Sequence, residues 1–361
     1  MVLSLGERLR QLPGPVLITG HTGFKGMWLT LLLERLKVPV VGLSLPATQF
    51  SLYERARRVG AIPEVFADIR NFDLVDACMK EHRPSAIFHL AAQPLVLESY
   101  KTPRETFETN VMGTVNILEA ASNSESVSGI VVVTTDKVYR NDNSGVRFTE
   151  TDALAGKDPY SASKVGAESA VAAWQQISAI SGGPKVVAVR AGNVIGGGDW
   201  AEDRLIPDLI RGFASNSEVI VRNPSSTRPW QHVLDPLTGY VMAMEEALKG
   251  DQIRALNFGP DSESLSVKDV VHISTEEWPL PTKVIFKDVN LQVETEAVAL
   301  ELDSSKARST LGWRSVWSQG ESVTATIKWW DKVLNQSVSA LDACDADIDF
   351  MLAKVRSLGN S

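Results

Sequence analysis

Short apolar runs alternate with stretches of helical periodicity along the first half of the chain. The apolar runs predict buried strands, because strands covered on both faces of a sheet read as continuous hydrophobic segments. They lie at residues 16–18, 38–45, 64–69, 86–93, 129–136 and 185–190. Apolar residues at helical spacing fall between them, at residues 27–36, 73–82 and 103–124, and again from Pro159 onward. This alternation predicts an α/β fold, a doubly wound parallel sheet with right-handed crossovers.

Three glycines at three-residue spacing, Gly20, Gly23 and Gly26, join the first predicted strand to the first helix. In such a loop one glycine permits the tight turn, one lets the backbone approach a pyrophosphate, and one allows close packing of helix on strand. The N-terminus of a helix also favours an anion. A glycine-rich turn can simply end a strand, but here it begins an alternating chain and predicts a Rossmann-type dinucleotide site.

The alternation becomes looser after residue 190, where tryptophans are frequent. A loop is predicted at 191–200, a helix opens at 204–207, and further helices are predicted at 321–333 and 345–356. We therefore expect an NAD-binding Rossmann domain over residues 1–190. Residues 191–361 would form a mainly substrate-binding region, interleaved with the last strands of the sheet.

Composition narrows the class of protein further. The 361 residues carry a formal net charge of −8, which argues against a nucleic-acid partner. Two cysteines, Cys78 and Cys344, are too few for a disulfide framework or a zinc site and fit a reducing compartment. No apolar run has the length of a membrane span, and the first ten residues do not resemble a signal peptide. We expect a cytoplasmic protein without a metal or a membrane partner.

Candidate catalytic residues follow the fifth predicted strand. Thr135, Asp136 and Lys137 come directly after it, and ligands of open parallel sheets bind outside the carboxyl ends of strands. Tyr160 and Lys164 are four residues apart and share a helix face. A lysine ammonium beside the phenol, with a cationic nicotinamide nearby, would lower the tyrosine pKa and produce a base near neutral pH.

Several positions near the expected cofactor allow two interpretations. Ser44 stands where an acidic residue often binds the ribose hydroxyls, so the choice between NAD and NADP stays open. Three nearby arginines could face a 2′-phosphate, although a solvated helix face is the favoured interpretation; they are Arg55, Arg57 and Arg58. Asp68 could accept a hydrogen bond from adenine, cap the next helix, or do both.

Further positions near the expected crevice also have a structural and a functional interpretation. His89, inside the fourth predicted strand, is expected to be a core histidine, and the small Ala91 and Ala92 would let a cofactor lie close. Arg204 and Arg228 could hold diphosphate oxygens in bidentate fashion. A surface salt bridge is an equally good interpretation for either arginine alone.

Taken together, these stretches resemble the extended short-chain dehydrogenase/reductases that modify nucleotide sugars, within the NAD-dependent epimerase/dehydratase family. The likeness is greatest to CDP-glucose 4,6-dehydratases and covers nearly everything from Val16 to about Trp330. Its most specific segments are residues 19–26, 89–96, 134–139, 158–164, 190–200 and 228–233, with 302–306 and 311–313 near the end.

The resemblance implies an NAD-dependent hydro-lyase of deoxysugar and O-antigen biosynthesis that converts CDP-glucose to CDP-4-keto-6-deoxyglucose. Hydride leaves C4 for NAD, water is lost across C5–C6, and hydride returns to C6. Tyr160 would remove the O4 proton, Thr135 would hydrogen-bond O4, and Lys164 would hold the ribose. Asp136 would protonate the departing 6-hydroxyl. Lys137 takes the place of a glutamate base in dTDP-sugar relatives.

The resemblance also implies two sets of binding residues and a partner. The cofactor set comprises Gly20, Thr22, Gly23, Phe24, Lys25, Gly26, Ser44, Asp68, Ile69, Leu90, Ala91, Ala92, Gln93, Asn110, Thr134, Tyr160 and Lys164. The substrate set comprises Gln93, Asn193, Arg204, Leu205, Arg228 and His232. A homodimer or higher oligomer is implied, with a four-helix contact built from residues 104–124 and 160–181.

Two departures from the family pattern leave alternatives open. Leu97 and Glu98 stand where an arginine usually follows, and the loop 140–147 lacks the expected aromatic residues. Another nucleotide-sugar enzyme, such as a 4-epimerase or a GDP-sugar dehydratase, is therefore an alternative. A catalytically silent nucleotide-binding homologue is a further one, which the intact Tyr160 and Lys164 pair disfavours.

Overall fold

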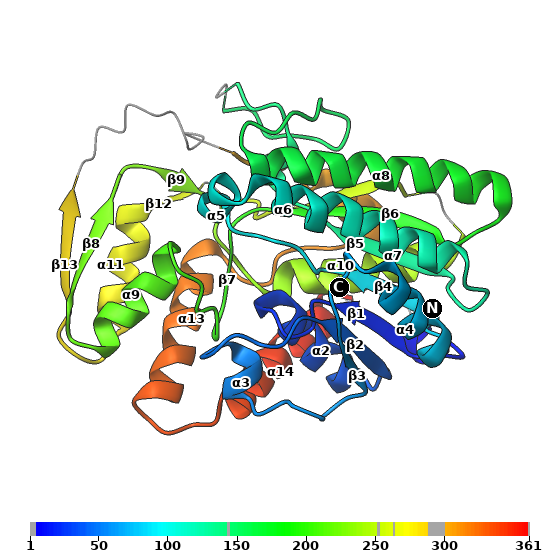
Figure 1. The fold of residues 1–361 in the computed structure, drawn as a ribbon. Helices are drawn as coiled ribbons and strands as arrows, with labels where there is room; N and C mark the ends of the chain where they lie inside the picture. Colours follow the sequence, from blue (N-terminus) through cyan, green and yellow to red (C-terminus); the bar gives the residue numbers. More distant parts are fainter. Residues whose placement is uncertain (1–4, 143–144, 251–252, 263, 288–299, 360–361) are drawn as a thin grey trace.

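Seven parallel strands form the centre of the molecule (Figure 1). The computed structural model describes residues 5–142, 145–250, 253–262, 264–287 and 300–359. The strands are β1 (Val16–Thr19), β2 (Val40–Ser44), β3 (Glu64–Phe66), β4 (Ala86–His89), β5 (Gly129–Val133), β6 (Lys185–Ala191) and β11 (Ala255–Phe258). Their order is β11-β6-β5-β4-β1-β2-β3, and every neighbouring pair is parallel. This confirms the predicted doubly wound α/β sheet.

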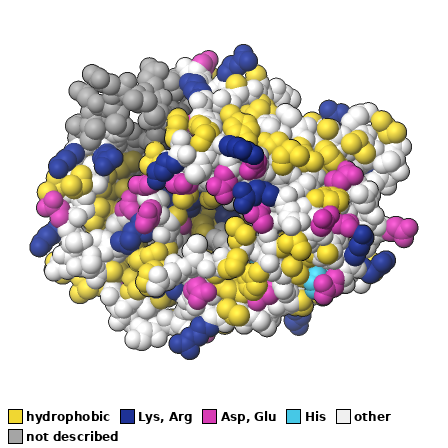
Figure 2. Space-filling model, in the orientation of Figure 1, with side chains coloured by type: hydrophobic (Ala, Val, Ile, Leu, Met, Phe, Trp, Pro, Cys, Tyr) yellow, Lys and Arg dark blue, Asp and Glu magenta, His cyan; other side chains and the backbone are white. Residues whose placement is uncertain are grey.

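The strand order reverses direction between β1 and β4. From β1 the chain moves outward through β2 and β3, and from β4 it moves the other way through β5, β6 and β11. In open parallel sheets the crevice outside the carboxyl ends of strands at such a point is where ligands bind. The space-filling view shows a hollow near the middle of one face of the molecule (Figure 2).

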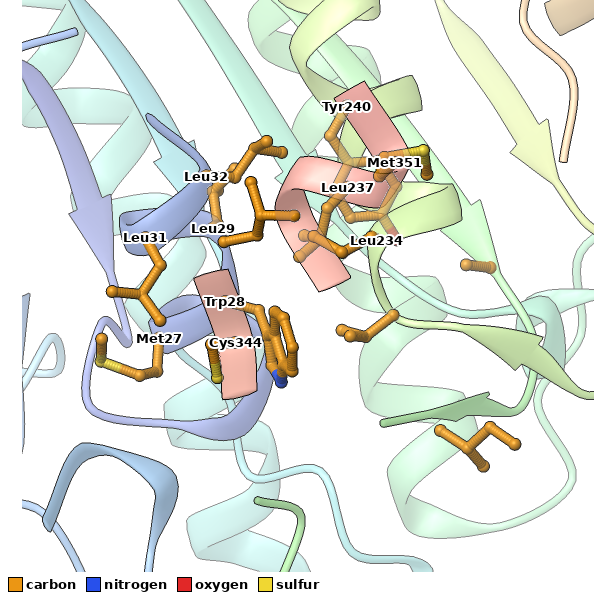
Figure 3. Close-up of a cluster of buried hydrophobic side chains, with 14 of the residues drawn as sticks. Met27, Trp28, Leu29, Leu31, Leu32, Leu234, Leu237, Tyr240, Cys344 and Met351 are labelled. Atoms are coloured by element: carbon orange, nitrogen blue, oxygen red, sulfur yellow. The ribbon is translucent and has the colours of Figure 1, made fainter. Parts of the chain in front are cut away.

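Helices cover both faces of the sheet (Figure 1). One face carries α2 (Phe24–Arg35), α10 (Leu234–Ala247) and α14 (Ala340–Gly359), and the other carries α4 (Phe72–His82), α7 (Gly113–Ser122) and α8 (Pro159–Ser181). Since side chains alternate along a strand, Val16 and Ile18 pack into one core and Leu17 into the other. Figure 3 shows the first core, where Leu29 of α2 faces Leu234 of α10.

A π-helical turn interrupts the helix expected over residues 103–124. The segment consists of α6 (Pro103–Phe107), the π turn (Glu108–Met112) and α7, and it follows the short α5 (Val96–Lys101). A π turn holds one extra residue in the helix, often at a functional site, and Asn110 lies inside this one. Helical periodicity alone did not predict it.

The second half of the chain adds small sheets beside the main one. Its strand pairs are β7 (Val194–Ile195) with β10 (Gln231–His232), β9 (Thr227–Arg228) with β12 (Leu265–Ser266), and β8 (Glu218–Arg222) with β13 (Lys283–Lys287). Its helices include α9 (Leu205–Ala214), α11 (Val267–Glu277), α12 (Ser305–Leu311) and α13 (Gln319–Leu334). Strand β11 returns to the main sheet, as an interleaved arrangement requires; the boundary at residue 190 stays a prediction.

Element boundaries correct several expectations. The fourth and fifth strands end at His89 and Val133, so residues 90–93 and 134–135 are loop and 136–138 form a 3₁₀ turn. The predicted helix at 345–356 is longer and begins at Ala340. Residues 143–144 of the departing loop lie outside the described ranges. Of the helices that the structure describes, none has the length and apolar character needed to cross a bilayer.

Candidate active site

The glycine loop after β1 leaves no room for side chains. Gly20 has a φ of +75°, and a Cβ there would lie 2.8 Å from the Ala91 nitrogen. A Cβ on Gly26 would lie 2.0 Å from the Gly20 carbonyl oxygen. Gly23 precedes α2 at its N-cap position. The loop therefore packs against the end of β4 and presents a helix N-terminus, a cradle that fits the pyrophosphate of a dinucleotide.

The end of β2 is occupied by a pair of hydroxyls. The Thr22 and Ser44 hydroxyl oxygens are 2.8 Å apart, and Thr22 also donates to the Leu45 carbonyl at 3.0 Å. The nearby arginines have other partners: Arg55 lies over the Trp200 ring, and Arg58 pairs with Glu34 at 2.5 Å. These partners argue against a 2′-phosphate site at the two arginines, and Arg55 packs on aromatic rings where a solvated helix face was expected.

Asp68 does not cap the following helix, contrary to one expectation. Asn71 is the N-cap of α4, and its side chain accepts from Leu74 N at 3.2 Å. The Asp68 carboxylate instead accepts hydrogen bonds from the backbone and guanidinium of Arg70, at 2.8 Å and 2.6 Å. Those bonds hold the Asp68 pKa below its usual range. The adenine contact of Asp68 stays a prediction.

The carboxyl end of β5 and the first turns of α8 bring the expected catalytic residues together. Thr135 donates to the Asp136 carboxylate at 2.9 Å, and its hydroxyl also hydrogen-bonds the Tyr160 phenol. Lys164 donates to the Val133 carbonyl at 3.1 Å. Helix α8 begins here because Asp158 caps it and Pro159 occupies its first position. Four of the five predicted catalytic side chains are buried; Lys137 is half-buried.

Burial shifts these groups toward their neutral forms. It raises the pKa of Asp136, raises the pKa of Tyr160 to about 12, and lowers the pKa of Lys164 to about 8. The interaction of the Tyr160 phenol with the Thr135 side chain opposes this rise in pKa. The expected lowering of the tyrosine pKa is therefore wrong for the polypeptide alone, where the Lys164 ammonium is engaged by the Val133 carbonyl.

Two further cations face the same cluster. Burial, together with the charge of Arg204, lowers the pKa of Lys25 to about 8, and the charge of Asp136 opposes this shift. The charges of Arg204 and Tyr160 also act on each other. Arg204 stands at the N-cap of α9 and donates to the Asp199 carboxylate at 2.9 Å. An anionic ligand between the glycine loop and α9 would thus meet positive charge from both sides.

Asn110 and Gln93 fix the loop after β4. The Asn110 amide accepts from Gln93 N at 2.8 Å, donates to the Gln93 carbonyl at 3.0 Å, and donates to Ser163 of α8 at 2.9 Å. The Gln93 side chain donates to the Thr106 hydroxyl at 3.0 Å. The π turn thus orients Asn110 toward both the loop and α8.

His89 is a core histidine, as expected. Its two ring nitrogens bond the hydroxyls of Thr19 at 2.7 Å and Thr114 at 3.0 Å. Burial lowers its pKa to about 3, so the ring is neutral near neutral pH. His89 links the ends of β1 and β4 to α7 by hydrogen bonds and does not act as a titrating group.

One expected substrate residue, His232, is enclosed in the core. His232 is 0% exposed, and its ring centroid is 4.2 Å from that of Trp317 and 5.9 Å from that of Trp28. The geometry places His232 in the core, and a direct substrate contact has no support from it. Arg228 donates to the neighbouring Thr227 carbonyl at 2.7 Å. Asn193 contributes its carbonyl to Gln231 N at 3.0 Å, and Leu205 is half-buried at the start of α9.

Glu168 is a residue that sequence reasoning missed. It accepts from the Thr134 hydroxyl at 2.6 Å and from two nitrogens of Arg190 at 2.7 Å and 2.8 Å. Its charge raises the Lys164 pKa against the effect of burial. The available signal was spacing, since Glu168 is four residues beyond Lys164 on the same helix face. Asp199, the partner of Arg204, was overlooked in the same way.

The fold and the site together define the class of protein. A doubly wound sheet with a glycine cradle at its first crossover, and a tyrosine–lysine pair beside a threonine after the fifth strand, is the arrangement of a short-chain dehydrogenase/reductase.

Comparison with known proteins identifies the family. The chain belongs to the NAD dependent epimerase/dehydratase family, whose sequence model matches residues 16–259. It is 41% identical over 325 residues to CDP-glucose 4,6-dehydratase of Salmonella typhimurium, covering 87% of this chain and 89% of that enzyme. It is 30% identical over 285 residues to UDP-glucose 4-epimerase of Rhizobium leguminosarum bv. trifolii, covering 74% of this chain and 84% of that enzyme.

Solved structures share the fold. UDP-glucose 4-epimerase of Thermotoga maritima, determined with UDP-glucose, has a TM-score of 0.78 at 21% identity, covering 89% of this chain and 100% of that one. MoeE5 in complex with UDP-glucose and NAD has a TM-score of 0.75 at 25% identity, again covering 89% and 100%.

Proposed function

We propose that the protein is an NAD-dependent 4,6-dehydratase that converts CDP-glucose to CDP-4-keto-6-deoxyglucose. The observation that carries this is the placement of Asp136 and Lys137 beside Thr135 after β5. Oxidation and reduction at C4 need only the threonine, tyrosine and lysine. Elimination of water needs an acid at O6 and a base at C5 as well. The 41% identity to the Salmonella typhimurium enzyme supports CDP-glucose as the substrate.

The glycine cradle fits the dinucleotide that this reaction requires. Gly20 and Gly26 leave space for backbone alone, so a pyrophosphate can approach the start of α2. Bound NAD would supply the hydride acceptor for C4 and the hydride donor for C6. Lys164 would hold the ribose hydroxyls, and the remaining predicted cofactor residues would line the crevice at the carboxyl ends of β1, β2 and β4.

Tyr160 and Thr135 act at O4 in this proposal. Thr135 orients the 4-hydroxyl by a hydrogen bond, and the Tyr160 phenolate removes its proton. Because burial raises the pKa of Tyr160 to about 12, the phenolate needs added positive charge. The charge of Arg204 already lowers the Tyr160 pKa, and the Lys164 ammonium and a bound cationic nicotinamide would add to this effect.

Asp136 and Lys137 act at C6 and C5. Burial raises the Asp136 pKa, which favours the protonated carboxyl that can deliver a proton to the departing 6-hydroxyl. Lys137 would remove the C5 proton in its neutral form. Lys137 follows Asp136 directly at the carboxyl end of β5, so both side chains are available to one elimination.

The nucleotide diphosphate would bind the cations on the other side of the hollow. A guanidinium suits paired phosphate oxygens, and Asp199 holds that of Arg204 in place. Lys25 would add charge from the glycine loop, and Asn193, Leu205 and Arg228 are proposed to complete the subsite by the family resemblance.

We also propose a homodimer built on α6 and α8, in the cytoplasm. Phe107 and Met112 are 42% and 51% exposed on the segment from α6 through the π turn. A shallow apolar groove lies beside them, lined by Pro103, Arg104, Phe107, Glu108, Val111 and Met112. An equivalent face on a second copy would cover this surface in a four-helix contact.

One assay tests the proposed activity. The purified protein is incubated with NAD and, separately, with CDP-glucose, UDP-glucose, dTDP-glucose or GDP-mannose, and the products are weighed by mass spectrometry. Loss of one water from CDP-glucose is the expected result. A new sugar nucleotide of unchanged mass, separated from the substrate by chromatography, would instead identify a 4-epimerase. Dehydration of GDP-mannose alone would identify a GDP-sugar dehydratase, and no conversion of any sugar would identify a silent homologue.

A further inference from the structure

The Arg55 guanidinium lies among aromatic rings. Its central carbon is 4.7 Å from the ring centroid of Trp200, 5.1 Å from that of Trp330 and 5.8 Å from that of Phe50. Its Nε donates to the Phe50 carbonyl at 2.9 Å. Within the described ranges no carboxylate forms an ion pair with it, and burial lowers its pKa. An arginine is held here by stacking, for which its flat, weakly hydrated head group is suited.

The rings come from three separate parts of the chain. Phe50 and Arg55 belong to the segment after β2 that includes α3 (Leu52–Arg55), Trp200 precedes α9, and Trp330 lies on α13. The Trp200 ring centroid is 5.1 Å from that of Trp330 and 6.2 Å from that of Phe50. The stack therefore ties the segment after β2 to the loop that leads into α9.

That loop carries the partner of Arg204. Gly198 has a φ of +81°, and a Cβ there would lie 2.6 Å from the Leu52 side chain, so the loop lies flat on α3. Asp199, 5% exposed, comes next and accepts from Arg204 at 2.9 Å. Trp200 follows, its carbonyl bonded by Arg211 of α9 at 2.9 Å. Fixing the Trp200 ring therefore fixes the carboxylate that aligns Arg204.

We infer that Arg55, through Trp200, is a positioning residue that holds the Asp199–Arg204 pair in the geometry needed to grip the diphosphate of the substrate. The inference rests on the proposed role of Arg204 as a diphosphate ligand. Arg55 itself touches neither substrate nor cofactor in this scheme. Its effect falls on affinity for nucleoside diphosphates, while the catalytic residues after β5 and on α8 stay as they are.

The test compares four variants in CDP binding and in turnover of CDP-glucose. Arg55→Met removes the stacking cation, Arg55→Lys keeps the charge without the flat head group, and Trp200→Phe keeps an aromatic face. Arg35→Met is the matched control, an arginine whose ion pair with Asp349 is exposed. We expect Arg55→Met to raise the Kd of CDP and the KM of CDP-glucose about tenfold. The kcat should change less than about twofold, since the diphosphate contact is weakened equally in the bound substrate and in the transition state.

Arg55→Lys and Trp200→Phe should both fall between wild type and Arg55→Met, and Arg35→Met should resemble wild type. A fall in kcat and melting temperature in both Arg55 variants, with CDP affinity unchanged, would overturn the inference and leave a merely structural arginine. If Arg55→Met does not fold, Arg55→Lys provides the test: a raised KM with a nearly unchanged kcat supports the inference, and a lowered kcat with an unchanged KM overturns it.

A double-mutant cycle tests whether Arg55 acts through Arg204. Arg55→Met should cost almost nothing further in CDP affinity once Arg204→Met is present, because the residue it aligns has gone. If the two substitutions instead multiply in their effects on the Kd of CDP, the inference is overturned. An unchanged Kd of CDP in Arg204→Met would remove the diphosphate role and the inference with it. The two effects on CDP binding could be non-additive while the wild-type protein leaves CDP-glucose unconverted. That result would refute the proposed function and leave the inference about Arg55 standing.

Discussion

Burial shifts the pKa of several active-site side chains in the direction that favours the neutral form. The pKa of Tyr160 rises to about 12, that of Asp136 rises, and that of Lys164 falls to about 8, because each charged form loses hydration. For Asp136 this shift favours the proposed acid. For Tyr160 it opposes the proposed base, so the phenolate depends on cations that the folded chain and a bound nicotinamide bring to it.

Tyr160→Phe tests the proposed base at O4. The change removes one oxygen and little volume, so the fold should persist. Loss of a general base should lower kcat by roughly 10²–10⁴-fold. Tyr100→Phe, at a half-exposed position, is the control and should keep full activity. Near-wild-type turnover of Tyr160→Phe would show that the catalytic assignment is wrong.

Asp136→Asn and Lys137→Met separate the two halves of the reaction. Both should spare oxidation at C4 and block elimination, because the proton donor to O6 or the base at C5 is gone. Reduced nicotinamide should then accumulate as a lasting near-ultraviolet absorbance after CDP-glucose is added, where wild type gives only a transient. Normal release of dehydrated product by both variants would exclude this pair from the elimination step.

Lys164→Met should stabilise the cofactor-free protein while abolishing its activity. The folded-state pKa of about 8 lies below the ordinary 10.5, so the unfolded chain binds more protons between these values and wild-type stability rises with pH there. At pH 7 the variant avoids a buried charge and should gain about 3 kcal/mol in unfolding free energy. Denaturant unfolding at several pH values should show this gain shrinking between pH 8 and 10.5, whereas Lys80→Met, an exposed control, should show no such trend.

At the scale of elements, the β1–α2 crossover depends on glycines that touch backbone. Gly26→Ala would bring a Cβ within 2.0 Å of the Gly20 carbonyl oxygen, and backbone must move to relieve it. We expect the Kd of NAD, measured by calorimetry, to rise at least about tenfold, a loss of about 1.4 kcal/mol. Gly320→Ala in α13, where the added Cβ meets only Ile273 at 3.8 Å, is the matched control and should bind NAD normally.

Elements differ in how clearly the sequence marks them. The strands from β1 to β6 were predicted because continuous apolar runs are typical of buried parallel strands. The π turn around Asn110 was missed, since one extra residue barely changes helical periodicity over so short a stretch. The short strand β11 was also missed; it acquires its identity only by pairing with β6.

At the scale of the whole molecule, the proposed dimer contact lies on α6 and α8. Phe107→Glu would place a charge in the centre of that contact and should shift the protein from dimer to monomer in sedimentation velocity. Phe350→Glu, a similarly exposed position on α14 across the sheet, is the control and should leave the dimer intact. A wild-type protein that sediments as a monomer at all concentrations would contradict the contact.

The sequence by itself determined the parts of this protein that depend on neighbours along the chain. Apolar runs, the spacing of Gly20, Gly23 and Gly26, and the spacing of Tyr160 and Lys164 are local signals. They were enough to predict the doubly wound sheet and the dinucleotide cradle, whereas the family resemblance rests on particular segments such as residues 190–200 and 228–233. His89 was also placed correctly, because a histidine inside an apolar run is most simply a core residue.

Only the tertiary structure decided what depends on residues distant in sequence. Arg204 approaches Lys25 and Tyr160, and His232 is enclosed by Trp28 and Trp317, through packing that no spacing encodes. The pKa of Tyr160 likewise rises because the fold removes water from the phenol. Local pattern indicates most of the helices and strands, whereas burial and charge at a site depend on every element packed around it.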